Sequence, residues 1–475
     1  MSERESIPQR SRLPRVPTRA ELAALLRLAV PVVVVQVGLM LMGAVDSIMA
    51  GHLSASALAA VALGNIYFFA VAVFGQGVLM ALDPLVAQAV GAHDEPAIAR
   101  ALQRGLVLAA ALSLPIGLLL WPAGAVLRAI GQPAEVVPGA AVYDVIMIPS
   151  VLPFFAFVVM RQTLQALHRM RPIVWVILLA NLTNIGLNWV LIYGNLGAPA
   201  MGVAGSAWAT TVSRWLMAVG LLLFAWRDLG PRLRPVVPEL FAWPPLRRML
   251  HLGIPIGLQY QAEYAVFGTV AMLMGRFGTV PVAAHQVAIN LASLTFMVPL
   301  GISAAATVLV GHAVGRGDMA AARRAALAAL VGGTVVMATT ALIMLTLPRP
   351  LAQLYTADRD VIALAALLLP IAGAFQIFDG LQVVSIGILR GAADTRAPFL
   401  IGVLGFWLIG FPVSLWLGFR TPLGAAGLWW GFVVGLAAVA LLLLARVRIR
   451  LRRHVTRVVV EATPVVESDR IGSAT

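Results

Sequence analysis

Long runs of apolar residues, separated by short polar connections, dominate the chain. Each run exceeds the roughly 20 residues that a helix needs to cross a bilayer. The runs predict membrane-spanning helices near residues 25–48, 57–83, 98–121, 139–161, 171–193, 201–225, 248–274, 282–311, 322–347, 361–389, 397–418 and 424–445. A membrane barrel would instead show segments of about ten residues with alternating hydrophobicity. The pattern therefore indicates an all-α integral membrane protein.

Composition supports this interpretation. The 475 residues are 60% hydrophobic and 11% charged, with a mean hydropathy of +0.92. A water-soluble surface of that composition would expose large apolar patches, so contact with lipid is the simpler explanation. The net charge of +14 comes from arginines clustered between apolar runs, which is typical of cytoplasmic loops and not of a nucleic-acid surface. With no cysteine, thiolate metal sites and disulfides are excluded, and we expect no cofactor and no nucleic-acid partner.

The arginines also predict the orientation. By our count, 28 lie in or beside the two tails and the even-numbered connections, whereas five lie beside the odd-numbered ones. Arg214 falls inside a span. Because basic residues concentrate on the cytoplasmic side, both termini are expected in the cytoplasm of a bacterial cell, with the chain in the inner membrane.

Three short segments recur in order at a nearly constant offset. Leu28–Pro31 matches Leu252–Pro255 and Ala89–Gly91 matches Ala313–Gly315, both offset by 224, while Gly202–Gly205 matches Gly424–Gly427 at 222. Two halves of six spans enter the membrane in the same direction, so a pseudo-two-fold axis along the membrane normal should relate two six-helix lobes. We expect an N-terminal tail (1–24), an N-lobe (25–226), a linker (227–247), a C-lobe (248–446) and a C-terminal tail (447–475).

Acidic residues inside spans carry the most functional information. A carboxylate within the bilayer is costly unless it faces a cavity or a partner, and Asp46, Glu263 and Asp379 lie within predicted spans. Burial favours the neutral form of a carboxyl group and a bound cation favours the carboxylate, so each can hold a proton, Na⁺ or a cationic substrate. Asn184 and Asn188 either line a cavity or bond neighbouring helices. The roles of Asp83 and Arg214 stay open.

Segments around these residues resemble the multidrug and toxic compound extrusion (MATE) family of transporters. The segments are Pro31–Gly51 with Val45–Gly51, Asn184–Gly194, Gly253–Gly275 around Glu263, and Phe375–Arg396 with Asp379–Gln382 and Leu389–Gly391. The resemblance spans nearly all of the hydrophobic chain. It implies two six-helix lobes forming a V and a secondary antiporter that exports organic cations or drugs in exchange for H⁺ or Na⁺.

The resemblance also implies site residues. Asp46 occupies the position of an N-lobe ion or proton site, and Asn184 and Thr210 match polar positions nearby. Glu263 and Asp379 match acidic residues of a C-lobe cation site, which would hold Na⁺ if transport is coupled to Na⁺. Phe375 lies one turn before Asp379, where some members have tyrosine, so a cation–π contact remains available without a hydroxyl ligand.

Other functions were weighed against this one. A flippase for lipid-linked oligosaccharides or lipids would need a basic cavity for phosphate, whereas three acids face a single arginine in the predicted spans. A membrane-embedded enzyme would need paired aspartates or a Ser/His arrangement on the spans, and we find neither, so we expect no enzymatic activity. A passive channel fits the two-lobe repeat less well than alternating access. We expect cationic or amphipathic drugs and membrane lipids as partners, and a monomer.

Overall fold

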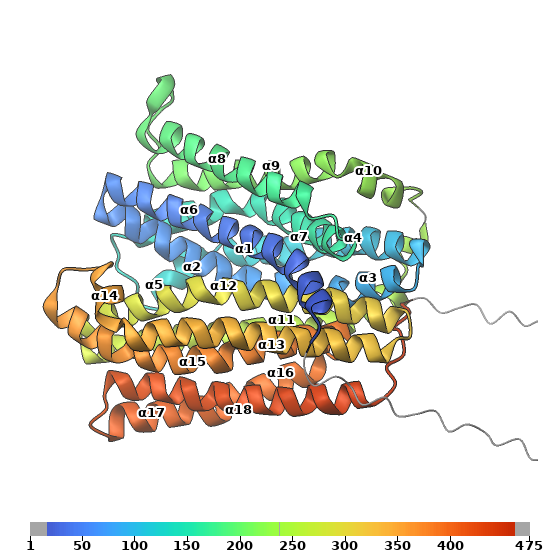
Figure 1. The fold of residues 1–475 in the computed structure, drawn as a ribbon. Coiled ribbons are helices and arrows are strands. Elements are labelled where there is room, and N and C mark those ends of the chain that lie inside the picture. The colour runs from blue at the N-terminus through green and yellow to red at the C-terminus, as the bar shows by residue number, and fades with distance from the viewer. Residues whose placement is uncertain (1–16, 237, 461–475) are drawn as a thin grey trace, which may run out of the picture.

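The computed structural model describes residues 17–236 and 238–460, and all regular structure in these residues is helical (Figure 1). Thr18 begins the first helix with a capping box, accepting from Glu21 N–H while the Glu21 carboxylate accepts from Thr18 N–H. The first half contains α1 (Arg19–Leu53), α2 (Ala55–Leu79), α3 (Leu82–Gly91), α4 (Glu95–Leu120), α5 (Ala123–Ala129), α6 (Val137–Met147), α7 (Val151–Ala166), α8 (Arg171–Tyr193), α9 (Val203–Phe224) and α10 (Trp226–Leu229).

The second half repeats this plan. Asp94 and Asp318, offset by 224, each cap a helix by accepting from the backbone N–H three residues later. The helices are α11 (Trp243–Met274), α12 (Thr279–Gly315), α13 (Met319–Thr346), α14 (Pro348–Gln353), α15 (Arg359–Gly391), α16 (Arg396–Gly402), the π-helical η6 (Val403–Gly410), α17 (Phe411–Arg420) and α18 (Ala425–Arg452). Short 3₁₀ segments are η1 (Ile148–Ser150), η2 (Asn195–Gly197), η3 (Gly230–Leu233), η4 (Pro238–Phe241) and η5 (Gly275–Phe277).

Within the described residues, eleven helical stretches are long and apolar enough to cross a membrane. Two of the eleven join consecutive helices, α2 with α3 and α6 with α7, and a third runs from α16 to α17. The remaining predicted span is α11, which has 32 residues but carries more polar side chains, among them Arg247, Arg248 and Glu263. The predicted twelve-helix membrane protein is confirmed.

Each half of the chain builds its own hydrophobic core. One buried cluster draws on residues between Val32 and Met249, and the other mainly on residues between Val266 and Val455. The start of α1 (Leu25, Leu28) joins the second cluster and its later turns join the first. In Figure 1 the blue-to-green helices of the N-lobe lie above the yellow-to-red helices of the C-lobe. The two predicted lobes are therefore present, with α1 packed against both.

The two lobes approach each other closely at two sites. These sites are at equivalent positions of the internal repeat. A Cβ added at Gly91 of α3 would lie 2.2 Å from the carbonyl oxygen of His312 on α12. A Cβ added at Gly315 of α12 would lie 2.1 Å from the carbonyl oxygen of Gln88 on α3. Gly91 and Gly315, like Gln88 and His312, are 224 residues apart. Such reciprocal contacts are what a two-fold axis between the halves produces.

Side chains at these positions fasten one lobe to the other. The Gln88 Nε2 donates to the carbonyl oxygen of Gly391 on α15 at 3.0 Å. In the reciprocal contact, His312 Nε2 lies 2.9 Å from the carbonyl oxygen of Ala166 on α7. These bonds lie at the end of the bundle where α3 lies, α1 begins and α18 ends, which we call the terminal end (Figure 1). The lobes are thus closed against each other at the terminal end.

The segment after α18, Arg453–Val460, crosses from the C-lobe back to the N-lobe. Arg457 Nη2 donates to Asp94 Oδ2 at 2.6 Å, and the Val458 N–H donates to Gln88 Oε1 at 2.8 Å. Burial alone would raise the pKa of Asp94. The hydrogen bonds from Arg457 and the Ala97 N–H, and the positive charges of Arg457 and Arg100, outweigh burial, so the pKa lies below its ordinary value. This tail therefore adds further contacts between the lobes to those made by Gln88 and His312.

Candidate functional site

In the N-lobe, a buried carboxylate is surrounded by hydrogen-bond donors. Asp46 of α1 accepts at Oδ1 from Asn184 Nδ2 (3.1 Å) and Asn188 Nδ2 (2.6 Å), both on α8. Its Oδ2 accepts from Thr210 Oγ1 of α9 at 2.5 Å. All four side chains are at most 4% exposed. Asn184 and Asn188 are one helical turn apart, so both amides reach the same carboxylate.

Asp46 lines a cavity of about 250 Å³ that also receives two arginines. Arg214 of α9 lies over the rings of Phe68 (4.2 Å) and Phe154 (4.8 Å), and its Nη1 donates to Ser150 Oγ at 3.0 Å. Arg161 of α7 donates to Gln36 Oε1 at 2.8 Å. Met297 of the C-lobe lines the same cavity, so this N-lobe cavity reaches the boundary between the lobes.

In the C-lobe, two carboxylates line a second cavity of about 360 Å³. Glu263 of α11 accepts from Gln259 Nε2 at 3.1 Å and from Gln382 Nε2 at 2.9 Å, through the same Oε1. Asp379 of α15 lines the cavity beside it and interacts electrostatically with Glu263. In the part of the chain that the structure describes, neither carboxylate forms an ion pair. The site therefore presents two acidic groups, of which Glu263 accepts hydrogen bonds from two neutral amides.

Aromatic side chains form the walls of this C-lobe cavity. Phe375 lies one turn before Asp379 and packs edge-on against Phe267, with ring centroids 6.1 Å apart, and Trp429, at 5.8 Å. Phe296 lines the cavity as well. A cavity with acidic groups and aromatic faces suits an organic cation, because carboxylates and ring faces both attract positive charge.

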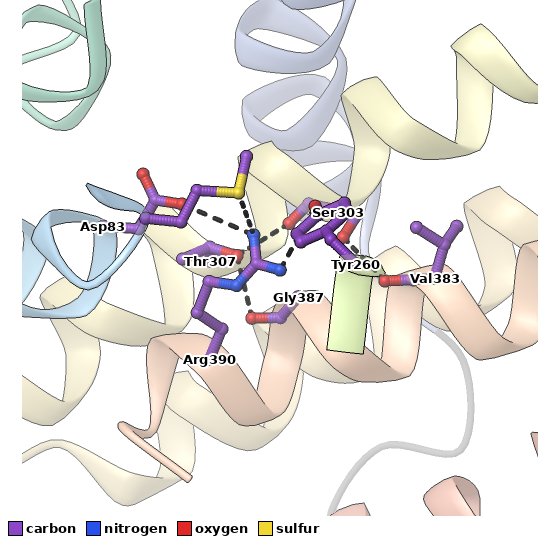
Figure 2. A network of polar contacts seen from close by, with 8 residues as sticks. Asp83, Tyr260, Ser303, Thr307, Val383, Gly387 and Arg390 are labelled. Carbon is purple, nitrogen blue, oxygen red and sulfur yellow. Dashed lines mark hydrogen bonds and ion pairs between the residues drawn. The ribbon is translucent and has the colours of Figure 1, made fainter. Parts of the chain in front are cut away.

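Figure 2 shows a polar network between the lobes that connects to this cavity. Arg390 of α15 points toward Asp83 of α3, with Nη1 and Oδ2 3.5 Å apart. Its Nη2 donates to the hydroxyl of Tyr260, which lines the C-lobe cavity, at 3.4 Å. Beside it, Ser303 and Thr307 of α12 donate to backbone carbonyls of α15. The pair Asp83–Arg390 thus joins the N-lobe, through Tyr260, to the lining of the C-lobe cavity.

The structure corrects one premise of the sequence analysis. Arg214 was expected to be the one arginine inside the spans, yet Arg161 and Arg390 are buried to the same degree, each 6% exposed. Both were counted with the polar connections because they lie at the ends of apolar runs. The helices continue through them, however, to Ala166 and Gly391. The predicted excess of acid over base holds for the C-lobe cavity, whose lining includes no arginine, and not for the N-lobe cavity.

The predicted site residues fall into two groups. Asp46, Asn184, Asn188 and Thr210 form the N-lobe cluster, and Glu263, Asp379 and Phe375 line the C-lobe cavity. No group of three or more His, Asp or Glu side chains within the described residues could hold a metal ion. Sequence reasoning missed Arg161, Gln259 and Gln382. The positions of Gln259 and Gln382, one turn before Glu263 and three residues after Asp379, are a signal that helical periodicity could have provided.

A twelve-helix bundle of two repeated lobes, each with a polar cavity between its helices, is the architecture of a membrane transporter. A sequence model of the MatE family matches residues 31–190 and 255–416. The chain belongs to the MATE family of transporters.

Similar proteins and solved structures support this assignment to the MATE family. The multidrug resistance protein MdtK of Edwardsiella ictaluri is 36% identical over 437 residues, covering 90% of this chain and 95% of that protein. The probable multidrug resistance protein NorM of Rhodopseudomonas palustris is 40% identical over 434 residues, covering 90% and 92%. A crystal structure of a eukaryotic MATE transporter superposes with a TM-score of 0.84 at 23% identity, covering 91% of this chain and 98% of that one, and shows the shared fold.

Proposed function

We propose that the protein is a multidrug efflux antiporter that exports organic cations in exchange for H⁺ or Na⁺. One observation carries the proposal: Glu263 and Asp379 share an aromatic cavity without a basic residue in its lining. Two carboxylates held in that way attract one class of ligand, cations. The names of the relatives, multidrug resistance proteins, support drugs as that cation.

Exchange follows from competition for the same acidic groups. A proton or Na⁺ bound at Glu263 and Asp379 removes the negative charge that holds an organic cation, so the two ligands displace each other. The Asp46 cluster provides a second place where a proton or Na⁺ can bind, since three donors orient its carboxylate beside a cavity. Alternate opening of the lobes at either end then converts the ion gradient into drug export.

The proposed orientation places both termini in the cytoplasm of a bacterial cell, with the chain in the inner membrane. The arginine distribution supports it. The end closed by Gly91, Gly315 and the tail is then the cytoplasmic end.

Equilibrium binding of a fluorescent organic cation to the purified protein tests the proposal. We expect H⁺ or Na⁺ to compete with the dye. Glu263→Gln and Asp379→Asn should each weaken dye binding roughly thirtyfold, because truncating a partner of a charged pair in a desolvated site costs about 2 kcal/mol or more. Glu135→Gln, at an exposed acid outside both cavities, is the matched control. Unchanged dye affinity in both cavity variants would contradict the proposal, and displacement of the dye by a lipid-linked diphosphate would favour a flippase.

A further inference from the structure

A groove of about 440 Å³ lies between α13 and α18 on the C-lobe, apart from the two cavities described above. Four arginines line it, two near the start of α13 and two near the end of α18: Arg323, Arg324, Arg448 and Arg452. The two helices run in opposite directions, so these arginines gather at the terminal end of the bundle (Figure 1).

The positive charge of this groove is largely uncompensated. Arg324 Nε pairs with Glu21 Oε1 at 3.0 Å, and Arg323 Nε donates to the carbonyl oxygen of Leu451 at 2.8 Å, which joins α13 to α18. Arg448 and Arg452 are exposed, and within residues 17–236 and 238–460 no acidic side chain pairs with either. Four arginines against one glutamate leave a surplus of positive charge that attracts an anion.

Below the arginines the groove becomes apolar. Leu327 and Leu330 line it from α13, and Leu444 and Val447 line it from α18. At about 1.5 Å per residue, Leu330 lies roughly 10 Å deeper along α13 than Arg323. Leu444 lies about 12 Å deeper than Arg452 along α18. On both helices the arginines thus lie toward the terminal end and the aliphatic lining extends deeper into the bundle.

This two-level lining matches an amphiphile. A soluble anion would satisfy the arginines but leave the aliphatic walls uncovered, and a neutral lipid would leave the arginines without a counter-charge. Basic pockets between helices at the cytoplasmic membrane surface are suited to anionic headgroups, with acyl chains lying along the helices below. The basic rim and the aliphatic walls together therefore match one kind of occupant, an anionic amphiphile.

We propose that this groove binds an anionic phospholipid, with its phosphate at Arg448 and Arg452 and an acyl chain along Leu327 and Leu444. Arg323 and Arg324 complete the basic rim from α13. The site does not depend on the transported substrate, so it stands or falls separately from the proposed transport function.

Binding of phosphatidylglycerol to the purified full chain, measured by native mass spectrometry, tests the proposal, with phosphatidylcholine as the neutral-headgroup comparison. The double variant Arg448→Gln/Arg452→Gln should weaken phosphatidylglycerol binding by roughly thirtyfold, because each basic residue near the surface contributes about 1 kcal/mol to anionic-lipid binding. Arg450→Gln is the matched control, because Arg450 is on the same helix and does not line the groove. We expect it to leave the affinity unchanged.

A second variant tests the apolar level alone. Leu327→Trp fills the groove while retaining all four arginines, and it should also weaken phosphatidylglycerol binding if an acyl chain lies there. Unfolding temperatures of all variants confirm that each is folded. Equal losses in Arg450→Gln and the double variant would overturn the site, since they indicate diffuse surface attraction. Displacement of the lipid by millimolar inorganic phosphate, with no effect of Leu327→Trp, would overturn the lipid as occupant.

Discussion

Replacing Gly91 by alanine should open the terminal end of the bundle. The added Cβ would lie 2.2 Å from the carbonyl oxygen and 2.7 Å from the Cα of His312, both backbone atoms of the opposite lobe. Backbone cannot rotate away as a side chain does, so α3 and α12 must separate. Overpacking of this kind costs typically 1–3 kcal/mol. In the conformation that opens this end the contact is absent, so that conformation gains about 5- to 150-fold in population relative to the closed one.

Distance measurements between spin labels detect such a shift. The chain contains no cysteine, so Arg171→Cys on the N-lobe and Ala320→Cys on the C-lobe would carry the only two labels. Both positions are exposed, at the terminal-end starts of α8 and α13. Gly91→Ala should increase the long-distance population, whereas Gly186→Ala, whose Cβ would meet nothing within 4 Å, should not. An unchanged distance distribution in Gly91→Ala would refute the reasoning.

Three further predictions concern the polar contacts. Thr210→Val removes the donor to Asp46 Oδ2 and should lower the free energy of unfolding by roughly 2 kcal/mol, measured by thermal unfolding in detergent. Asp83→Asn leaves Arg390 buried without its acidic partner and should cost about 3 kcal/mol in the same assay. Because the pKa of Asp94 is lowered in the folded chain, its stabilisation of the tail is complete above its ordinary pKa of 3.8 and fades only as the pH falls through the lowered value. Hydrogen exchange in the tail should therefore show equal protection at pH 8 and pH 5, after correction for the intrinsic exchange rate.

Controls for these predictions are available in the chain. Thr210→Ser keeps the hydroxyl and should retain most of the stability, so equal losses in the serine and valine variants would count against the hydrogen bond. Adding Arg390→Met to Asp83→Asn removes the orphaned charge and should recover part of the loss; strict additivity would show that the two residues do not interact. Loss of tail protection between pH 8 and pH 5 would contradict the lowered pKa of Asp94.

The repeat predicted more of the fold than the individual segments did. The offset of 224 residues predicted a two-fold relation, and the structure places Gly91 against His312 and Gly315 against Gln88 in that relation. Hydrophobic runs predicted the spans because lipid exposure imposes a simple requirement on composition. The tail crossing to Asp94 was not predicted, because a single long-range ion pair leaves no periodic pattern in the sequence.

The site was predicted in part, for a similar reason. Asp46, Glu263 and Asp379 were found because acids are rare within apolar runs, and the structure supplies the partners of Asp46 and Glu263. Arg161 and Arg390 were not found, since an arginine at the end of an apolar run looks the same whether it faces water or a neighbouring helix. The coupling and binding roles of these residues stay predictions.

Efflux of a fluorescent organic cation from protein in liposomes, driven separately by a pH gradient and a Na⁺ gradient, tests the central claim most directly. Asp46→Asn, Glu263→Gln and Asp379→Asn are compared with the wild type and with Glu135→Gln as control. The account predicts that one gradient drives dye movement, that neutralising an acid of the C-lobe cavity abolishes it, and that the control transports normally. Dye movement that needs neither gradient, or that survives in all three carboxylate variants, would contradict the account.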